Sequence, residues 1–414
     1  MKKILLFLAL LFISGCTSFG RGVAEAILNK DNTEDHRQCD IIGEKINGIN
    51  DYFQQNKIVK VMMIHGVGSH TPGYATRIRE NLAKSLDLTV FSKRAKDITL
   101  LNPDDGKTEI GNLQVIRMQN EERTKDLIFY ELTWSNITSK QKKILDYDTS
   151  GKYAYKRAPF NHSMKKFLND TVPDPMIYLI DKDNLILNAS KQASCWMLGH
   201  NWNQLKDNQK QVCRVSSYNQ LKDLSNENII YITHSLGSRI LMDSMTDIVN
   251  EIAQADVHQN RDAELIINEL KNKNITVFML ANQLPILQIG RKSPAVTNQI
   301  SSYCKKKGKN YHNRVFKQVD IVAFSDPNDL LSYDIPQSFV DSYIDSRMCP
   351  SLTNVNINIA EEISAFGLSV VNPVASHTEY DNDERVIEMI SQGTRHLKED
   401  KVLNKKCRFI ELDD

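Results

Sequence analysis

The chain has 414 residues, with 52 Lys and Arg against 51 Asp and Glu, a formal net charge of +1, and 41% hydrophobic residues. This balance excludes a nucleic-acid-binding surface that depends on a large excess of basic side chains, and the composition is ordinary for a globular protein. The length fits one large fold with an insertion, or two modest domains.

Residues 1–16 have the pattern of an export signal: Lys2 and Lys3, an apolar run, and a small-residue end at Cys16. The apolar run is too short to count as a spanning helix of the mature protein. Its ending, Ile13-Ser-Gly-Cys16, resembles the lipobox of bacterial lipoproteins, which implies a signal peptide of residues 1–15 and acyl chains such as palmitate on Cys16. The absence of aspartate after the cysteine implies the outer membrane, facing the periplasm or the surface. A plain signal peptide cleaved nearby is the alternative, and residues 16–46 are expected to form a polar tether.

Without Cys16, an even set of cysteines remains, which is compatible with up to three disulfides in an exported chain. They are Cys39, Cys195, Cys213, Cys304, Cys349 and Cys407. We favour the pair Cys195–Cys213, because both cysteines lie in one predicted insertion. Free buried thiols are the alternative for the others. No cysteine and histidine cluster has the spacing of zinc ligands, so no metal site is predicted.

The elements predicted in chain order alternate between strands and helices. Residues 57–64 form an apolar run that predicts a buried strand, followed by a glycine-rich loop and a helix over 74–86. Strands are predicted at 113–118 and 126–134. Residues 135–227 are polar with scattered apolar and aromatic positions, which indicates a mostly helical insertion. Strands at 229–232, 275–280, 319–324 and 354–359 and helices at 262–271 and 384–391 follow. This alternation predicts an α/β fold with a mostly parallel sheet covered by helices on both faces.

The join between the strand at 229–232 and the next helix has the pattern of a nucleophile elbow. In such an elbow a serine sits on a sharp strand-to-helix turn, and small residues flank it because the turn is crowded. Here the pattern is Thr233-His-Ser-Leu-Gly237, with threonine at a position that is usually glycine. Ser235 is therefore the candidate nucleophile, and His234 is expected to be a packed spacer.

Other reactive side chains follow predicted strands in the order Ser, Asp, His. Asp326 and Asp329 come after the strand at 319–324, and His377 precedes the last helix. Because reactive groups collect at the carboxyl ends of parallel strands, these residues are expected to meet Ser235 there.

These motifs resemble the α/β-hydrolase family, of the esterase and lipase kind. His65-Gly-Val-Gly68 resembles its H-G-x-G oxyanion loop, Thr233–Gly237 its elbow, and the segment around His377 the region of its catalytic histidine. The resemblance implies a hydrolase domain over residues 47–414, with a cap insertion at about 135–227. Asp329-Leu-Leu331 resembles the family's acidic segment, so Asp329 is the expected acid and Asp326 the alternative. The implied oxyanion donors are the N–H groups of Val67 and Leu236.

The expected function is a serine hydrolase that cleaves carboxylic esters through an acyl-enzyme intermediate, with no metal or organic cofactor. The expected partners are a hydrophobic or acyl-ester substrate and a membrane bound through Cys16, with no nucleic acid. A peptidase or thioesterase of the same fold is one alternative, and a non-catalytic binding lipoprotein is another. His65 is expected to be structural, and the three tryptophans are expected to be packing residues.

Overall fold

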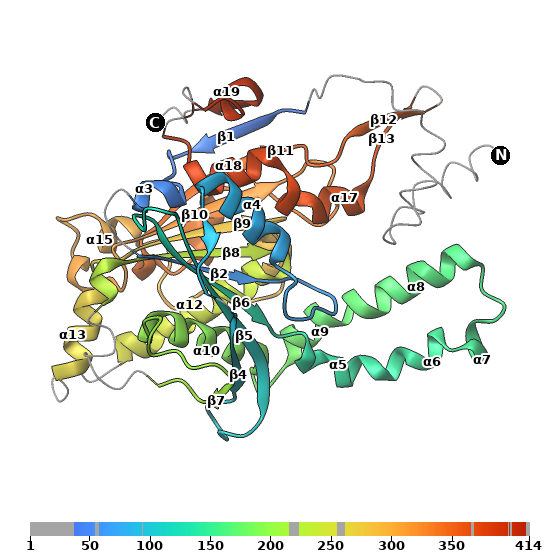
Figure 1. Ribbon diagram of the computed structural model, residues 1–414, viewed down its shortest axis with the longest axis horizontal. Coiled ribbons are helices and arrows are strands. Elements are labelled where there is room, and N and C mark those ends of the chain that lie inside the picture. The colour runs from blue at the N-terminus through green and yellow to red at the C-terminus, as the bar shows by residue number, and fades with distance from the viewer. Residues whose placement is uncertain are drawn as a thin grey trace.

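The computed structural model describes residues 37–53, 58–92, 94–214, 223–254, 261–365, 368–395, 397 and 400–410. The predicted signal peptide and Cys16 lie outside these residues. Within them, one 12-stranded sheet forms the centre of the molecule, in the order β14-β1-β11-β10-β9-β8-β2-β6-β5-β4-β7 with β3 paired to β5 (Figure 1). No helix in the described ranges has both the length and the apolar character of a membrane span.

The middle of the sheet consists of six neighbouring strands that pair in parallel. They are β11 (Pro350–Ile357), β10 (Gln318–Ser325), β9 (Asn274–Leu280), β8 (Glu227–His234), β2 (Ile58–Ile64) and β6 (Asp126–Thr133). Antiparallel pairs occur outside this group, for example between β6 and β5 (Glu109–Gln119). The predicted α/β class with a mostly parallel sheet is confirmed, and the continuous apolar runs that predicted the strands are buried on both faces.

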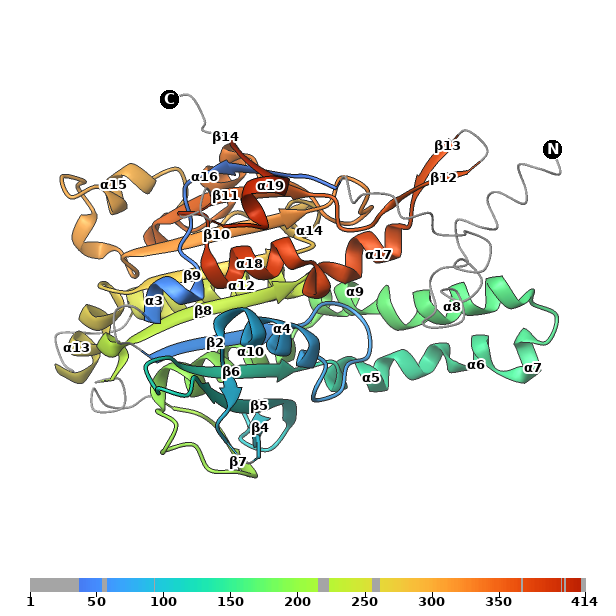
Figure 2. The ribbon, with the colours of Figure 1, turned by 45° about the horizontal axis from the view of Figure 1, so that its top comes forward.

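Helices cover both faces of this sheet (Figure 2). On one face lie α10 (Leu185–Gly199) and α12 (Leu236–Gln254), and on the other lie α3 (Ile49–Phe53), α4 (Thr76–Leu86) and α18 (Glu384–Gln392). Successive side chains of a strand point to opposite faces, so Met62 of β2 enters the first core and Val61 and Met63 enter the second.

The remaining elements connect this framework or extend its edges. They are β1 (Cys39–Gly43), β3 (Thr89–Val90), β4 (Lys96–Leu101), β7 (Gln209–Gln211), β12 (Glu362–Ala365), β13 (Leu368–Val371), β14 (Cys407–Ile410), α5 (Asn136–Lys142), α6 (Asp146–Thr149), α7 (Gly151–Ala154), α8 (Pro159–Thr171), α9 (Pro173–Ile180), α13 (Arg261–Leu270), α14 (Leu284–Gln288), α15 (Ile300–Cys304), α16 (Gln337–Tyr343), α17 (Pro373–Thr378) and α19 (Leu403–Lys406).

The segment predicted as one cap insertion, residues 135–227, has two different parts. Helices α5 to α9, residues 136–180, project from the molecule on the side where the parallel strands end, and we call them the arm (Figure 2). In contrast, α10 belongs to the main core, because its Ile186, Ala193 and Trp196 are almost fully buried. The predicted boundary is therefore wrong for α10. The apolar face of α10 is hard to recognise in the sequence, because serines, an asparagine and a glutamine interrupt it. Several of these polar side chains are buried as well.

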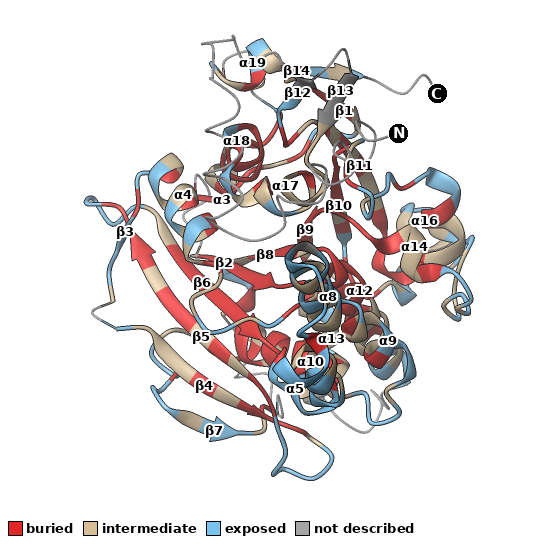
Figure 3. Ribbon diagram, turned by 90° about the vertical axis from the view of Figure 1, so that its right-hand side faces the viewer, coloured by how far each residue is buried: buried red, intermediate tan, exposed pale blue. Residues whose placement is uncertain are grey.

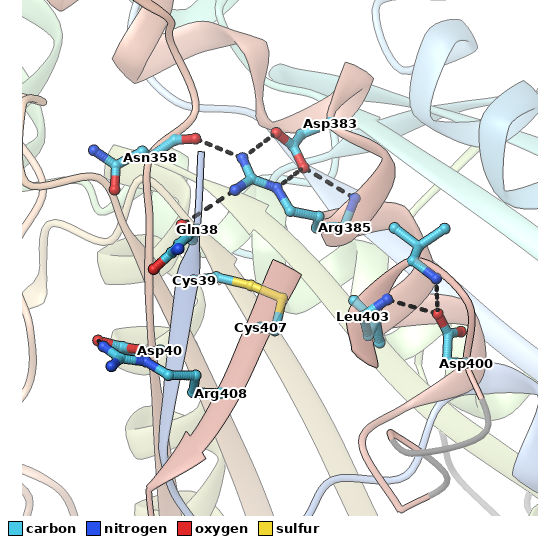
Figure 4. Close-up of a disulfide and its surroundings, with 11 residues drawn as sticks. Gln38, Cys39, Asp40, Asn358, Asp383, Arg385, Asp400, Leu403, Cys407 and Arg408 are labelled. Carbon is cyan, nitrogen blue, oxygen red and sulfur yellow. Dashed lines mark hydrogen bonds and ion pairs between the residues drawn. A yellow bond between two sulfur atoms is a disulfide. The ribbon is translucent and has the colours of Figure 1, made fainter. Parts of the chain in front are cut away.

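The two ends of the described chain meet at one edge of the sheet. Strand β1 pairs in parallel with β14, and a disulfide joins Cys39 to Cys407 (Figure 4). Asp40 and Arg408 form an ion pair at 2.8 Å beside it. The predicted tether over residues 16–46 therefore extends too far, because β1 is a strand of the central sheet. The sequence did not indicate this strand, because it is short and its partners lie more than 300 residues away.

All six cysteines within the described ranges are paired. The favoured pair Cys195–Cys213 is confirmed, and it fastens α10 to the chain that leaves β7. The third disulfide joins Cys304 to Cys349. Of the three tryptophans, Trp134 and Trp196 are buried and Trp202 packs against the core, as expected.

A buried ion pair connects β2, β8 and α10. The ammonium of Lys60 lies 2.7 Å from Glu227 Oε2, and it donates hydrogen bonds to the carbonyls of Met197 and His200 at 2.7 and 2.9 Å. Burial lowers the pKa of Lys60 and raises the pKa of Glu227, and their mutual attraction opposes both shifts. The pair therefore fixes three elements at one point in the core.

Replacing Lys60 by Met should lower the free energy of unfolding by about 3–5 kcal/mol, because it leaves the Glu227 carboxylate buried without its closest cation. Urea unfolding followed by circular dichroism measures this change. The matched control is Lys210→Met, which breaks an exposed pair with Glu109 and should change stability by about 0.5 kcal/mol or less. Equal effects of the two substitutions would contradict this role for Lys60.

Candidate active site

Ser235 occupies a sharp turn between β8 and α12. Its φ of 55° lies in the left-handed region, which non-glycine residues rarely adopt. The Ser235 N–H donates to the Leu280 carbonyl at 2.9 Å, and the Ser235 carbonyl accepts from Ser238 Oγ at 2.7 Å. These bonds hold the backbone of Ser235 in the geometry of a nucleophile elbow.

Two glycines are required by the crowding around this turn. A Cβ on Gly66 would lie 2.6 Å from the Cβ of Ser235, and a Cβ on Gly237 would lie 2.5 Å from the Ile64 carbonyl oxygen. Both distances are too short for real side chains, so only glycine fits. The loop after β2 therefore packs directly against the serine.

Threonine at the first position of the elbow is accommodated inside the sheet. Thr233 pairs with Ile64 of β2 and Met279 of β9 and is fully buried. Its hydroxyl has no hydrogen-bond partner within the described part of the chain. A buried hydroxyl without a partner costs about 1–3 kcal/mol, so this position lowers stability without obstructing the turn.

The structure brings three of the predicted residues into one hydrogen-bonded chain. His377 Nε2 lies 3.1 Å from Ser235 Oγ, and His377 Nδ1 lies 2.8 Å from Asp329 Oδ2. The Asp329 side chain is 1% exposed and the His377 side chain 12% exposed. His377 lies on α17, whose first turn is capped by the Asn372 side chain. Both distances lie within the hydrogen-bond reach that a nucleophile, a base and an orienting acid would require.

Asp326, the alternative acid, has other partners. Its carboxylate accepts hydrogen bonds from the N–H groups of Asn328 and Ile359, both at 2.7 Å. Its carbonyl accepts from the Asp329 N–H at 3.0 Å. Asp326 therefore shapes the loop that presents Asp329, and it is Asp329 that contacts the histidine.

His234 contacts the backbone of His377. Its Nε2–H donates to the His377 carbonyl at 2.7 Å, and the two rings meet edge to face with centroids 5.1 Å apart. Burial, together with the neighbouring His377, lowers the pKa of His234 to about 3, so the ring stays neutral at ordinary pH. Sequence reasoning treated this residue as a spacer and missed the contact, because nothing in the sequence shows which carbonyl it reaches.

His65 has the structural role that was expected. Its ring stacks on Trp134 with centroids 4.6 Å apart, and its Nε2 accepts from the Trp134 N–H at 3.1 Å. Its Nδ1–H donates to the Gly66 carbonyl at 2.8 Å. Burial, reinforced by the neighbouring His70, holds the pKa of His65 well below its usual value. Both ring nitrogens are thus occupied in fixing the loop.

The loop after β2 is also held from the arm. The Gly68 N–H donates to Asp174 Oδ2 at 2.7 Å, and the Ser69 N–H donates to Asp170 Oδ2 at 2.9 Å. Lys142 Nζ lies 2.7 Å from Asp174 Oδ1 and 3.3 Å from Asp170 Oδ1. Asp174 is completely buried, and Lys142 supplies the positive charge that a buried carboxylate needs. We call Asp170, Asp174 and Lys142 the arm latch; no sequence signal predicted it.

The two predicted oxyanion donors lie on the elements that meet at Ser235. Leu236 is the first residue of α12, and the first N–H groups of a helix have no partner within the helix. Val67 follows Gly66, the residue packed against Ser235, in the loop held by the arm latch. Both N–H groups are therefore carried by backbone that is fixed next to the serine hydroxyl.

The low pKa of His234 predicts a loss of stability in acid. An unfolded histidine binds a proton near pH 6.5, whereas folded His234 binds one only near pH 3. Between these values the unfolded chain holds more protons, so stability falls as the pH falls. Replacing His234 by Gln should reduce this slope by up to about 1.4 kcal/mol per pH unit between pH 6 and 4.

Urea unfolding at a series of pH values measures the slope. The control is Ser235→Ala, which alters the same site without removing a titrating group and should keep the slope of the unaltered protein. An unchanged slope in His234→Gln would refute the neutral state of folded His234.

No family model matches this chain, and no curated protein or solved structure shows a match. The geometry of the site is therefore the basis on which a function can be assigned. It brings together Ser235 in its sharp turn, the His377 ring and the buried Asp329 carboxylate.

Proposed function

We propose that this protein is a serine hydrolase of the α/β-hydrolase type that cleaves carboxylic esters. The observation that carries the proposal is the hydrogen-bonded chain from Ser235 through His377 to Asp329, with the serine in left-handed backbone at the end of a central parallel strand. The site lies at the carboxyl ends of the neighbouring strands β2 and β8. Strands β9, β10 and β11 follow on the far side of β8, whereas β6 lies on the far side of β2, so the strand order reverses between β2 and β8. Open α/β sheets bind their ligands at such switch points.

In the proposed reaction, Ser235 Oγ attacks the ester carbonyl while its proton passes to His377 Nε2. Asp329 holds the histidine tautomer and stabilises the imidazolium that forms. The N–H groups of Val67 and Leu236 stabilise the oxyanion. The tetrahedral intermediate then collapses, the alcohol leaves with the proton from His377, and Ser235 carries the acyl group. Water, deprotonated by His377, then attacks the acyl carbonyl. The intermediate collapses, the carboxylic acid leaves, and His377 returns the proton to Ser235 Oγ.

Apolar side chains next to the acid favour a hydrophobic substrate. Leu330 and Leu331 follow Asp329 directly and are 74% and 44% exposed. The Leu331 N–H donates to Asp329 Oδ1 at 2.9 Å, so these leucines are fixed relative to the triad. An acyl ester in the bacterial envelope, reached by a chain anchored at Cys16, fits this surface and the signal pattern of residues 1–16.

Replacing Ser235 by Ala should abolish labelling by a fluorophosphonate probe and lower ester hydrolysis by about 10⁴-fold or more. The two aspartates provide an internal comparison. Asp329→Asn should lower kcat by about 10⁴-fold, because the histidine loses its orienting carboxylate, while Asp326→Asn should lower kcat less, because the Asp329 carboxylate is retained. Labelling that persists in Ser235→Ala would refute the proposal. A panel of oxygen esters, thioesters and peptides would separate an esterase from a thioesterase or a peptidase.

The arm latch predicts a kinetic effect away from the triad. Asp174→Ala releases Gly68 from its acceptor, so kcat should fall by about 10²-fold, as for the loss of one oxyanion donor, while KM changes little. Asp174→Asn, which retains an acceptor oxygen, should recover part of the loss. The control is Asp148→Ala, which removes an arm ion pair with Arg157 that does not touch the loop. Equal kcat values for Asp174→Ala and Asp148→Ala would contradict the latch.

A further inference from the structure

The arm is the most apolar part of the described surface. Of 17 large apolar side chains that are exposed in the described ranges, 10 lie between Ile144 and Ile180. Ile144 is 84% exposed, Ile180 75% and Tyr155 71%. Figure 3 shows how widely solvent reaches α5 and α8. Such a concentration of exposed apolar side chains marks a surface that binds a protein, a membrane or a ligand.

Five of these side chains form one stripe. Val172 joins α8 to α9 with helical φ and ψ of −65° and −34°, so the two helices form nearly one rod. Apolar residues then recur on the helical period, at Leu168, Val172, Met176, Leu179 and Ile180. Asp170 and Asp174 fall on a different side of the rod, where they hold the loop beside Ser235. One side of the rod therefore contacts the loop beside Ser235, and the stripe on the other side is exposed among the described residues.

The exposed charges of the arm are mostly positive. The arm exposes six lysines, which are Lys140, Lys143, Lys152, Lys156, Lys165 and Lys166, and one exposed acid, Asp146. Its other carboxylates are engaged in ion pairs, Asp148 with Arg157 and both latch aspartates with Lys142. Lys142 balances only one of the two latch aspartates, so the net charge of the arm, residues 136–180, is 8 − 4 = +4.

We propose that the arm docks on the surface of a bilayer that contains anionic phospholipid. A segment that exposes both apolar or aromatic side chains and lysines binds at the boundary between headgroups and acyl chains, and each lysine is attracted by the anionic headgroups. The lysine stems pass along the apolar surface while their ammonium groups reach the phosphates. A protein partner fits less well, because lysine is depleted at protein–protein interfaces. This surface is independent of the reaction proposed above.

Hydrogen exchange of the full chain in nanodiscs tests the proposal. We compare discs of phosphatidylcholine alone with discs that also contain phosphatidylglycerol, and follow the amides of residues 164–180. Anionic lipid should slow their exchange about tenfold, and high salt should reduce the difference. The double variant Met176→Glu with Ile180→Glu should lose this protection. The control Val90→Glu, at a side chain 58% exposed but outside the arm, should keep it.

Three outcomes would overturn the proposal. Exchange in the arm could be the same in both kinds of disc, or the double variant could keep the protection. Protection could also appear in phosphatidylcholine alone and grow with the number of chains per disc, which would assign the stripe to a second copy of the chain. Ser235→Ala should bind as the unaltered chain does, so failure of the hydrolase proposal and failure of this one are distinguishable.

Discussion

Close packing between the end of β2 and the turn that carries Ser235 is the constraint on which the site depends. Neither Gly66 nor Gly237 has room for a Cβ, so the loop and the first turn of α12 lie in direct contact. This contact requires β2 and β8 to be neighbours, which they are in the sheet order. The left-handed backbone of Ser235 is held by this packing and by its bond to Leu280, so the strain is supported by the whole parallel core.

Buried charge connects the arm to the same place. A carboxylate as buried as Asp174 is stable only with a cation and hydrogen-bond donors, and it finds Lys142 within the arm and the Gly68 N–H outside it. The polar groups of the loop are thereby satisfied by residues about 100 positions later in the chain. The arm that helps to hold the loop beside the serine therefore also presents the apolar stripe.

The features that could be predicted from the sequence are those with a local signature. Continuous apolar runs predicted the central strands, and the Ser, Asp, His order at strand ends anticipated residues that the structure brings together. Features that depend on distant partners could not be predicted. Strand β1 exists because β14 and β11 flank it, and α10 mixes small polar residues into a buried face. The contact of His234 with the His377 carbonyl and the latch aspartates likewise depend on tertiary contacts alone.

The edge of the sheet also determines how the fold bears mechanical load. Any pull applied through the N-terminal segment reaches the sheet at β1, a five-residue strand that lies between β14 and β11. The Cys39–Cys407 bond passes that pull covalently to β14, and Arg385 on α18, paired with Asp383, donates to the Gln38 carbonyl at 3.1 Å (Figure 4). Force is therefore shared between both chain ends and a core helix. The strands around Ser235 lie several strands away from this edge and are shielded from it.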